Sequence, residues 1–487
     1  MTTKQTKIVA TISDWRSTED FIRELYESGM NVVRMNSAHL SEEGFRKIIS
    51  NTRAVSKNIA ILMDTKGPEI RTTAIENDAK INFQTGDTLK FVGNPDVLTS
   101  KECIALNYKN FVKDLSTGLH ILIDDGELDF LVTEKHEDYL IGVAQNNGEL
   151  GSRKSVNVPG VRINLPSLTE KDRINIQYAI DMGVDFIAHS FVRNRQDIID
   201  IQEILDAHNS PIKIIAKIEN QEGVDNIDEI LEVAYGVMVA RGDLGIEVPQ
   251  EKIPGIQRLL IKKCVQAKKP VIVATQMLHS MINNPRPTRA EVTDIANAIY
   301  YRTDALMLSG ETAYGKYPVE AVKTMASIAL EAEKTKMPEN DIPVPIVDGD
   351  ISLFMSKQAV DSTTKLQTKA IITDSHSGRT ARNIAAYRAN RPVIAICYQE
   401  HLIRELALSY GIRPMYLESK GTARDYFFNG LTMMLENKMV SAEDRVAYVG
   451  GSFGEGGGTT FLEVNTVGKI MEHSSDYILP HFKSEDK

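Results

Sequence analysis

Residues 212–244, IKIIAKIENQEGVDNIDEILEVAYGVMVARGDL, contain one complete strand–helix–strand unit. The runs 212–219 and 236–244 are short and apolar, as the buried strands of a parallel sheet are. Between them, 223–233 has the spacing of an amphipathic helix. Both apolar runs end in charged residues, so the unit predicts a parallel sheet with polar groups at the carboxyl ends of its strands.

The same pattern recurs along the chain. Helical segments such as 18–28 and 169–182 separate most of the apolar runs, and Thr169 followed by Asp172 has the pattern of a capping box. Eight strand–helix units predict a closed parallel barrel of the TIM (β/α)8 type. The apolar runs are 7–13, 31–36, 59–65, 185–191, 212–219, 236–244, 270–277 and 305–310.

Two further domains are expected beside the barrel. In 73–166 β signals dominate, and 118–134 has the pattern of a hairpin with Asp125 and Gly126 at its turn. The segment KMPENDIPVPIVDGD (336–350) is rich in Pro and Asp, which is typical of a domain boundary. A second strand–helix series follows it. We therefore expect an α/β chain whose parts are a barrel (1–72 and 167–340), an inserted small β-barrel domain acting as a lid (73–166), and a C-terminal open α/β regulatory domain (341–487).

Composition and charge exclude several classes of protein. The chain has 487 residues, is 42% hydrophobic and carries a formal net charge of −10, which argues against a nucleic-acid partner. Its apolar runs are too short for a membrane helix, and its first residues lack the apolar stretch of a signal peptide. Cys103, Cys264 and Cys397 have neither paired nor metal-site spacing, which favours reduced thiols. We expect a cytoplasmic protein with no membrane partner.

The carboxyl ends of the expected barrel strands are unusually polar. In such barrels the working residues lie at these ends. A solvated loop explains one polar strand end, but a shared site explains many together better. The polar residues are Arg34 and Asn36, Asp64 and Thr65, His189 and Ser190, Lys217 and Glu219, Arg241 and Asp243, Thr275 and Gln276, and Ser309 and Glu311.

Alternation along a strand predicts that Lys217 and Glu219 point the same way, and likewise Arg241 and Asp243. A buried salt-bridge network is one interpretation of these charges. The other is a site for Mg²⁺ or Mn²⁺, which take one or two protein carboxylates and complete their shell with water and substrate oxygens. Lys217 would then stabilise a developing negative oxygen. A Schiff-base role for Lys217 is also conceivable, but a neighbouring metal favours the electrostatic role.

Three other segments resemble phosphate-binding loops. GETAYGK (310–316) matches the P-loop spacing, but Tyr317 stands where Ser or Thr would bind Mg²⁺. GGSFGEGGG (450–458) lacks a following helix and lysine, which suits a flexible turn or an anion-binding loop. SHSGRTAR (375–382) follows an expected strand and precedes a helix. It fits an ordinary capped helix and a phosphate site at a helix N-terminus equally well.

Taken together, the motifs resemble those of the pyruvate kinase family over nearly the whole chain. MVARGDLG (238–245) and DTKGPEIRT (64–72) are the most specific. The family's architecture is the one expected above. The other matching segments are NVVRMN (31–36), GSRKSVNVPG (151–160), SFVR (190–193), AKIENQEG (216–223), ATQML (274–278) and SGETAYGKYP (309–318).

The resemblance implies phosphoryl transfer from phosphoenolpyruvate to ADP, which gives pyruvate and ATP. By position, Lys217, Arg34 and Thr275 would be catalytic. Glu219 and Asp243 would bind Mg²⁺ or Mn²⁺. Arg71 and the lid residue Lys154 would approach the nucleotide phosphates when the lid closes. The implied substrate-binding residues are Arg34, Ser190, Gly242, Asp243 and Thr275.

A K⁺ site is implied at Asn36, Asp64 and Thr65. The chain departs from the family here, because Ala38 stands where the family usually has a serine, although neighbouring Ser37 can partly compensate. Glu69 matches the potassium-dependent members of the family, so we expect K⁺ dependence.

The resemblance also implies an allosteric site for a phosphorylated metabolite. Fructose 1,6-bisphosphate is one candidate, and AMP or a sugar monophosphate is another. The later Gly-rich loop carries Glu455 and no arginine, which weakens the bisphosphate interpretation. Like most of the family, the chain is expected to form a homotetramer. The effector residues would be Ser375, Ser377, Gly378, Arg379 and Thr380.

Two rival functions remain at this point. A metal-dependent barrel lyase or aldolase acting on a pyruvate enolate shares the metal and the barrel, but it has no need of Arg71 or of a lid with Lys154. A catalytically silent metabolite sensor would not require Lys217, Glu219 and Asp243 to be retained together.

Overall fold

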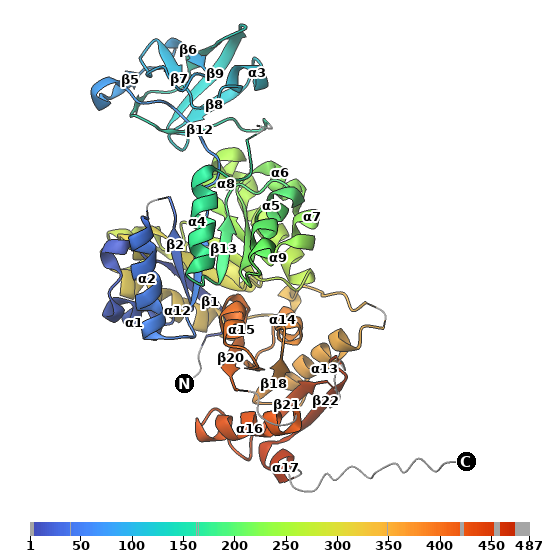
Figure 1. Cartoon of the computed structure of the whole chain (residues 1–487). Helices are drawn as coiled ribbons and strands as arrows, with labels where there is room; N and C mark the ends of the chain where they lie inside the picture. The colour runs from blue at the N-terminus through green and yellow to red at the C-terminus, as the bar shows by residue number, and fades with distance from the viewer. Residues whose placement is uncertain are drawn as a thin grey trace.

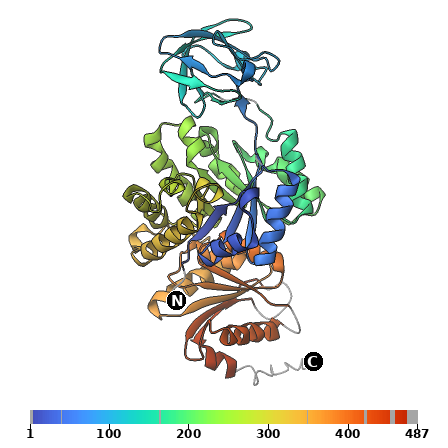
Figure 2. The ribbon, with the colours of Figure 1, turned by 90° about the vertical axis from the view of Figure 1, so that its left-hand side faces the viewer.

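The computed structural model describes residues 4–38, 40–161, 163, 165–347, 349–418, 423–451 and 458–472. Three bodies lie in a row, with a small β domain at one end, the barrel in the middle and the C-terminal domain at the other end (Figures 1 and 2). In this part of the chain no helix has the length and apolar character needed to cross a membrane.

The central body is a closed eight-stranded parallel barrel, which confirms the predicted fold class. Strand order follows the chain around the barrel except that the small β domain is inserted between β3 and β13. The strands are β1 (Lys7–Thr11), β2 (Val32–Asn36), β3 (Ala60–Asp64), β13 (Phe186–His189), β14 (Lys213–Ile218), β15 (Gly236–Ala240), β16 (Val271–Ala274) and β17 (Ala305–Leu308).

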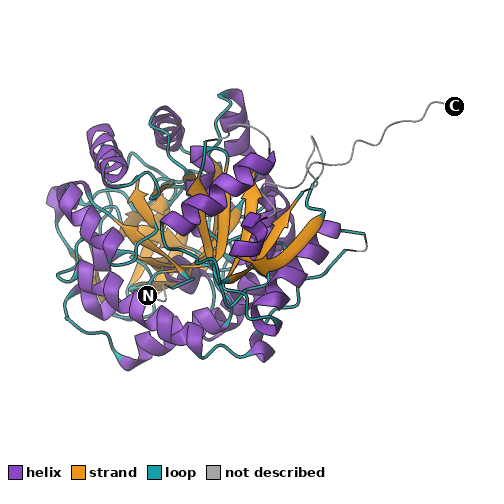
Figure 3. Cartoon of the chain, turned by 90° about the horizontal axis from the view of Figure 1, so that it is seen from below, coloured by secondary structure: helices purple, strands orange, loops and turns teal. Residues whose placement is uncertain are grey.

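Helices surround this barrel, as Figure 3 shows from the side of the C-terminal domain. The predicted capping box is present, because the Thr169 side chain accepts from the Asp172 backbone N–H at the start of α4 and Asp172 bonds back. The surrounding helices are α1 (Glu19–Glu27), α2 (Glu42–Val55), α4 (Glu170–Asp181), α5 (Arg195–Ala207), α7 (Ile227–Val233), α9 (Ile253–Gln266), α10 (Arg289–Tyr300) and α12 (Pro318–Lys334). Shorter helices α6 (Gln221–Asp225), α8 (Arg241–Glu247) and α11 (Gly310–Ala313) follow strands β14, β15 and β17.

Alternation along the strands divides the barrel's apolar residues between two cores. Val9, Leu62, Ile215 and Ile272 belong to the core inside the barrel. The residues between them in sequence, such as Ile214, pack with the surrounding helices. Successive side chains of a strand point alternately into the barrel and out of it. This alternation also decides which polar residues at the strand ends point toward the barrel mouth.

The inserted domain, here called the lid, contains a seven-stranded sheet and a two-stranded sheet. The predicted hairpin is confirmed, since β8 and β9 pair antiparallel across a turn at Asp125 and Gly126. The large sheet has the order β4 (Ile70–Arg71), β12 (Ser155–Asn157), β8 (His120–Ile123), β9 (Leu128–Lys135), β10 (Leu140–Ala144), β6 (Thr88–Val92), β7 (Cys103–Ala105). Strands β5 (Ile81–Phe83) and β11 (Gly148–Leu150) form the small sheet, and α3 (Phe111–Asp114) is the lid's helix.

The C-terminal domain is an open five-stranded sheet with helices, as predicted. Its first four strands are parallel, and the last pairs antiparallel with β21. The sheet order is β20 (Ile412–Tyr416), β19 (Val393–Cys397), β18 (Ala370–Ser375), β21 (Arg445–Gly450), β22 (Phe461–Thr466). Its helices are α13 (Ile351–Lys365), α14 (Arg379–Ala386), α15 (Glu400–Glu405), α16 (Ala423–Glu436) and α17 (Val467–Glu472).

Candidate active site

Charged side chains at the barrel mouth continue the series that points into the barrel. Lys217 is two residues beyond Ile215, and Asp64 is two residues beyond Leu62. Arg34 follows Val32 in the same way. The three strands β2, β3 and β14 therefore deliver two cations and a carboxylate to one place.

Asp64 lies at the centre of this group. Its Oδ2 pairs with the Arg34 guanidinium and lies 3.3 Å from Lys217 Nζ. The Asp64 side chain is 1% exposed. Burial acts to raise the pKa of Asp64, but Arg34 and Lys217 outweigh it and hold the pKa below its ordinary value. Asp64 is therefore a carboxylate whose charge is balanced by two cations.

Lys217 contacts three groups. Its Nζ donates to Ser190 Oγ (2.8 Å), lies 2.8 Å from Glu219 Oε1, and pairs with Asp64. Burial acts to lower the pKa of Lys217, but Glu219 and Asp64 outweigh burial and raise the pKa above its ordinary value. A Schiff-base lysine must lose its proton, so this environment disfavours that alternative and favours a permanent ammonium.

Glu219 and Asp243 are the two carboxylates that the sequence analysis expects to hold a divalent metal. Glu219 is buried, and its Oε2 accepts from the Phe191 backbone N–H at 2.7 Å. Burial, together with repulsion from Asp243, raises the pKa of Glu219. A hard cation held between the two carboxylates would remove this repulsion, so the residues fit Mg²⁺ or Mn²⁺. The described residues contain no group of three or more His, Cys, Asp or Glu suited to a metal, so water and substrate would complete the shell.

Oxygen atoms also gather at the expected K⁺ site. Asp64 Oδ1 and Ser37 Oγ are buried without a hydrogen-bond partner in the described part of the chain. Asn36 Oδ1 accepts from the Ala38 backbone N–H at 3.1 Å, and the Thr65 carbonyl accepts from Ser190 Oγ at 2.7 Å. Unpartnered buried oxygens are costly unless a ligand satisfies them, so the unpartnered Asp64 oxygen fits a monovalent cation, and Ser37 Oγ, next to Asn36 in the chain, is a second unpartnered oxygen. His39 of the same motif lies outside the described residues.

Thr275 lies directly beyond β16 in a left-handed conformation, with φ of 68°. Its Oγ1 accepts from the Gly242 backbone N–H at 2.9 Å. The hydrogen bond joins the end of β16 to the first turn of α8, which carries Gly242 and Asp243. These three substrate-site candidates are therefore neighbours.

Arg241 differs from the prediction. Strand β15 ends at Ala240 and α8 begins at Arg241, so the expected alternation of Arg241 with Asp243 does not hold. The guanidinium pairs with Asp294 of α10 (2.7 Å) and donates to the Thr275 carbonyl (2.5 Å). Arg241 thus braces the loop of Thr275.

Glu311 also has a structural environment. It is buried, and its carboxylate accepts from the backbone N–H groups of Leu278 (3.1 Å) and Ser309 (2.8 Å). It connects the loops after β16 and β17.

The two residues expected to bind nucleotide are not brought to this cluster. Arg71 Nε donates to Glu69 (2.7 Å), and Arg71 Nη1 donates to the Arg153 carbonyl (2.9 Å). Lys154 Nζ lies 2.7 Å from Asp124 Oδ2 within the lid. In this orientation of the lid, residues of the lid and its hinge therefore supply the hydrogen-bond and ion-pair partners of both cations.

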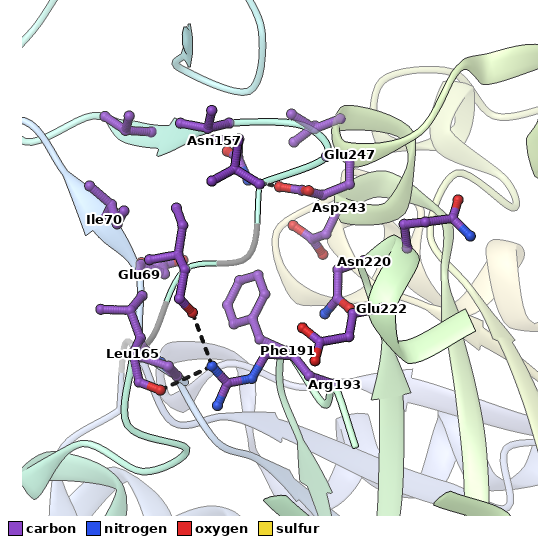
Figure 4. A pocket seen from close by; sticks show the side chains of 18 of the residues that line it. Glu69, Ile70, Asn157, Leu165, Phe191, Arg193, Asn220, Glu222, Asp243 and Glu247 are labelled. Atoms are coloured by element: carbon purple, nitrogen blue, oxygen red, sulfur yellow. Dashed lines mark hydrogen bonds between the residues drawn. The ribbon is translucent and has the colours of Figure 1, made fainter. Parts of the chain in front are cut away.

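A cavity of about 520 Å³ lies between lid and barrel (Figure 4). Asp243 borders both this cavity and the Lys217 cluster, whereas Lys217 itself does not line the cavity. Asn157, Arg193 and Glu247 line it as well, and sequence reasoning assigned them no role. Asn157 and Arg193 lie in segments that match the family motifs, 151–160 and 190–193. The sequence does not indicate which residue each of them contacts.

The expected effector loop connects β18 to α14. Gly378 precedes α14 with φ of 71°, and Ser375 Oγ accepts from its backbone N–H at 2.8 Å. Ser377 and Arg379 are exposed, and Thr380 Oγ1 lies 2.7 Å from Thr459 Oγ1. Of the Gly-rich run 450–458, residues 452–457, with Glu455, lie outside the described residues.

Comparison with known families agrees with this architecture. Residues 3–322 match the family model described as the pyruvate kinase barrel domain, and 354–465 match the pyruvate kinase alpha/beta domain. The chain belongs to the pyruvate kinase family. It is therefore an enzyme of the phosphotransferase class.

Individual pyruvate kinases resemble the chain over nearly its full length. A pyruvate kinase of Borreliella burgdorferi is 47% identical over 96% of this chain and 98% of its own. One from Geobacillus stearothermophilus is 43% identical over 96% of this chain and 81% of its own. The crystal structure of a pyruvate kinase from Cryptosporidium parvum superposes with a TM-score of 0.89 at 35% identity, covering 95% of this chain and 96% of that one.

Ser190 is expected to position Lys217, because its hydroxyl donates to the Thr65 carbonyl and accepts from Lys217 Nζ. We predict that Ser190→Ala lowers kcat about 10-fold, the effect of losing one hydrogen bond to a charged group. Ser13→Ala is the matched control, because Ser13 Oγ donates to the Ala313 carbonyl away from Lys217. Steady-state kinetics with thermal unfolding of both variants would measure this, and an unchanged kcat in Ser190→Ala would contradict it.

Proposed function

We propose that this pyruvate kinase family member transfers the phosphoryl group of phosphoenolpyruvate to ADP at the Lys217 cluster. One observation carries the assignment, namely a permanently charged Lys217 held by Glu219 and Asp64 at the mouth of the barrel. The reaction breaks the bond between phosphorus and the enol oxygen and forms a bond to the terminal phosphate oxygen of ADP. Negative charge therefore develops on the enol oxygen and on the migrating group, where an ammonium stabilises it.

The roles proposed for the other residues follow from their positions at the mouth. Arg34 would bind phosphoryl oxygens, since its guanidinium adjoins Asp64 at the same mouth. Ser190, Gly242, Asp243 and Thr275 would contact or position phosphoenolpyruvate, with Thr275 on the face where enolpyruvate takes up its proton. Glu219 and Asp243 would hold Mg²⁺ or Mn²⁺, which supplies further charge neutralisation at the phosphoryl oxygens.

ADP would bind between barrel and lid. Arg71 and Lys154 are the cations proposed for its phosphates, and both now pair with neighbouring groups. Exchanging those partners for phosphate requires the lid to move over the mouth. Closure would also exclude water from the reacting groups, which strengthens every charge interaction there.

Family membership and composition also lead us to propose a homotetramer located in the cytoplasm.

Lys217→Met tests the assignment. The variant keeps most of the side-chain volume and removes the charge, so we expect ADP-dependent pyruvate formation from phosphoenolpyruvate, with Mg²⁺ and K⁺ present, to fall at least about 1,000-fold. Lys213→Met is the matched control, because Lys213 is the first residue of the same strand β14 and lies at its opposite end. Full activity in Lys217→Met, or an equal loss in Lys213→Met, would refute the role of Lys217.

K⁺ is proposed to bind through Asn36, Asp64 and Thr65, with Ser37 contributing in place of the serine absent at Ala38. The unpartnered oxygens of Asp64 and Ser37 support this. We expect Glu69→Lys to raise the activity measured without K⁺, because it adds a fixed cation to the hinge beside the site. Glu137→Lys makes the same charge change on an exposed part of the lid and should leave K⁺ dependence unaltered. Equal K⁺ dependence in Glu69→Lys and wild type would count against the proposal.

The effector is proposed to be a phosphorylated metabolite bound at Ser375, Ser377, Gly378, Arg379 and Thr380. The exposed side chains of Ser377 and Arg379 at the start of α14 support an anion site. A panel of fructose 1,6-bisphosphate, AMP and sugar monophosphates would identify the activator. We expect Ser377→Ala with Thr380→Ala to abolish its activation while basal activity persists, and Ser441→Ala in the same domain to have no effect. Undiminished activation in the double variant would exclude this loop.

A further inference from the structure

Two hinge segments join the lid to the barrel, and both are fastened on the barrel side. Asp172 Oδ1 accepts from the backbone N–H groups of Lys66 (2.8 Å) and Gly67 (3.4 Å). Arg193 forms a two-pronged ion pair with Asp197 and donates to the carbonyls of Ile163 (3.2 Å) and Leu165 (3.0 Å). The barrel ends of both hinges are therefore fixed. The orientation of the lid then depends on contacts between the lid and the barrel outside the hinges.

Gly67 shows how tightly the first hinge is packed. Its φ is 73°, a conformation that L side chains avoid, and an added Cβ would come within 2.7 Å of the Phe191 ring. This hinge can bend at its lid side but has no room to slide over the barrel.

Beyond these hinge contacts, a hydrogen bond between described residues joins the sheet of the lid to the barrel. Asn157 Nδ2, at the end of β12, donates to Glu247 Oε1, at the end of α8, over 3.0 Å (Figure 4). The two residues line the same cavity from opposite sides. Burial raises the pKa of Glu247, and no described lysine or arginine pairs with it. Asn157 is thus the hydrogen-bond partner of a half-buried carboxyl group.

Helix α8 connects this contact to the proposed metal and substrate site. It has seven residues, with Gly242 and Asp243 in its first turn and Glu247 at its end. Buried Leu244 anchors its middle, and the Gly242 backbone N–H is tied to Thr275 Oγ1. Asp243 and Glu247 lie four residues apart on this one short helix, so a shift of α8 would move both.

We propose that the Asn157–Glu247 hydrogen bond is a latch that sets the orientation of the lid and couples it to Asp243 through α8. Asn157 and Glu247 are then positioning residues. Lys154 lies three residues before Asn157 in the same lid segment and pairs with Asp124 inside the lid, so the latched orientation fixes where the lid carries Lys154 relative to the mouth. Releasing the latch frees that segment to approach the mouth. The coupling to Asp243 rests on the proposed function, whereas the latch itself does not.

The chain carries its own pair of probes for lid orientation. Trp15 is the single tryptophan and is exposed in the 3-10 turn Asp14–Arg16, which follows β1 at the barrel mouth. Cys103 lies in lid strand β7 and is half-buried, whereas Cys264 and Cys397 are buried. Energy transfer from Trp15 to a thiol-reactive acceptor on Cys103 therefore reports the separation of lid and barrel.

We expect Asn157→Ala and Glu247→Ala to change this energy transfer by the same amount in the absence of substrate. The double variant should change it no further, because either substitution already removes the one bond. Glu247→Gln should retain the wild-type value, since its amide oxygen still accepts from Asn157. Asn147→Ala is the control, because the Asn147 amide oxygen accepts only from Thr85 within the lid. Wild-type transfer in both alanine variants, or additive changes in the double variant, would overturn the latch.

Kinetics test the coupling separately. We expect KM for phosphoenolpyruvate to rise about 5-fold in Asn157→Ala and in Glu247→Ala, with wild-type KM in Glu247→Gln and Asn147→Ala. A KM that stays unchanged while energy transfer changes would refute the coupling through α8. Energy transfer needs no turnover, so failure of the proposed reaction would leave the latch measurement intact, and thermal unfolding of each variant would confirm that it is folded.

Discussion

The site depends on one electrostatic constraint, the buried carboxylate of Asp64 between Arg34 and Lys217. Removing three charges from water is expensive, and such a group persists only where each charge faces an opposite charge and a hydrogen-bond partner. Ser190 supplies one of these partners by linking Lys217 to the Thr65 carbonyl. The cluster is balanced within itself, yet it leaves one Asp64 oxygen unpartnered. The charges at this mouth are therefore already fixed in place, as the proposed phosphoryl transfer requires.

Strand parity explains how the barrel assembles this cluster. Alternate residues on each strand fill the barrel interior, and the next member of each inward series becomes a mouth residue. Lys217, Asp64 and Arg34 obey this rule because they continue Ile215, Leu62 and Val32. Arg241 lies beyond the end of β15, in the first turn of α8, and pairs with Asp294. The rule therefore places the strand residues of the cluster, whereas the start of α8 decides the supporting position of Arg241.

The lid adds a second level of control. The two residues proposed to bind the nucleotide, Arg71 and Lys154, form ion pairs with Glu69 and Asp124. In this orientation their charges are therefore not part of the Lys217 cluster. In the structure, with Asn157 bonded to Glu247, Arg71 and Lys154 pair with Glu69 and Asp124 and not with the Lys217 cluster. Bringing these cations and the cluster together only when both substrates are bound would limit transfer of the phosphoryl group to water.

The sequence by itself determined the barrel, the inserted domain and the C-terminal sheet, because hydrophobic periodicity and turn residues act locally. It also predicted that the polar strand ends, with Lys217, Glu219 and Asp243 as the central group, share one mouth, since parallel strands bring their carboxyl ends together; the direct contact of Asp64 with Lys217 came from the structure. It could not determine where β15 ends, so the direction of Arg241 was wrong. Nor could it pair Asn157 with Glu247, which are 90 positions apart. Only the tertiary structure decided those contacts, because they depend on the orientation of one domain against another and on where a helix begins.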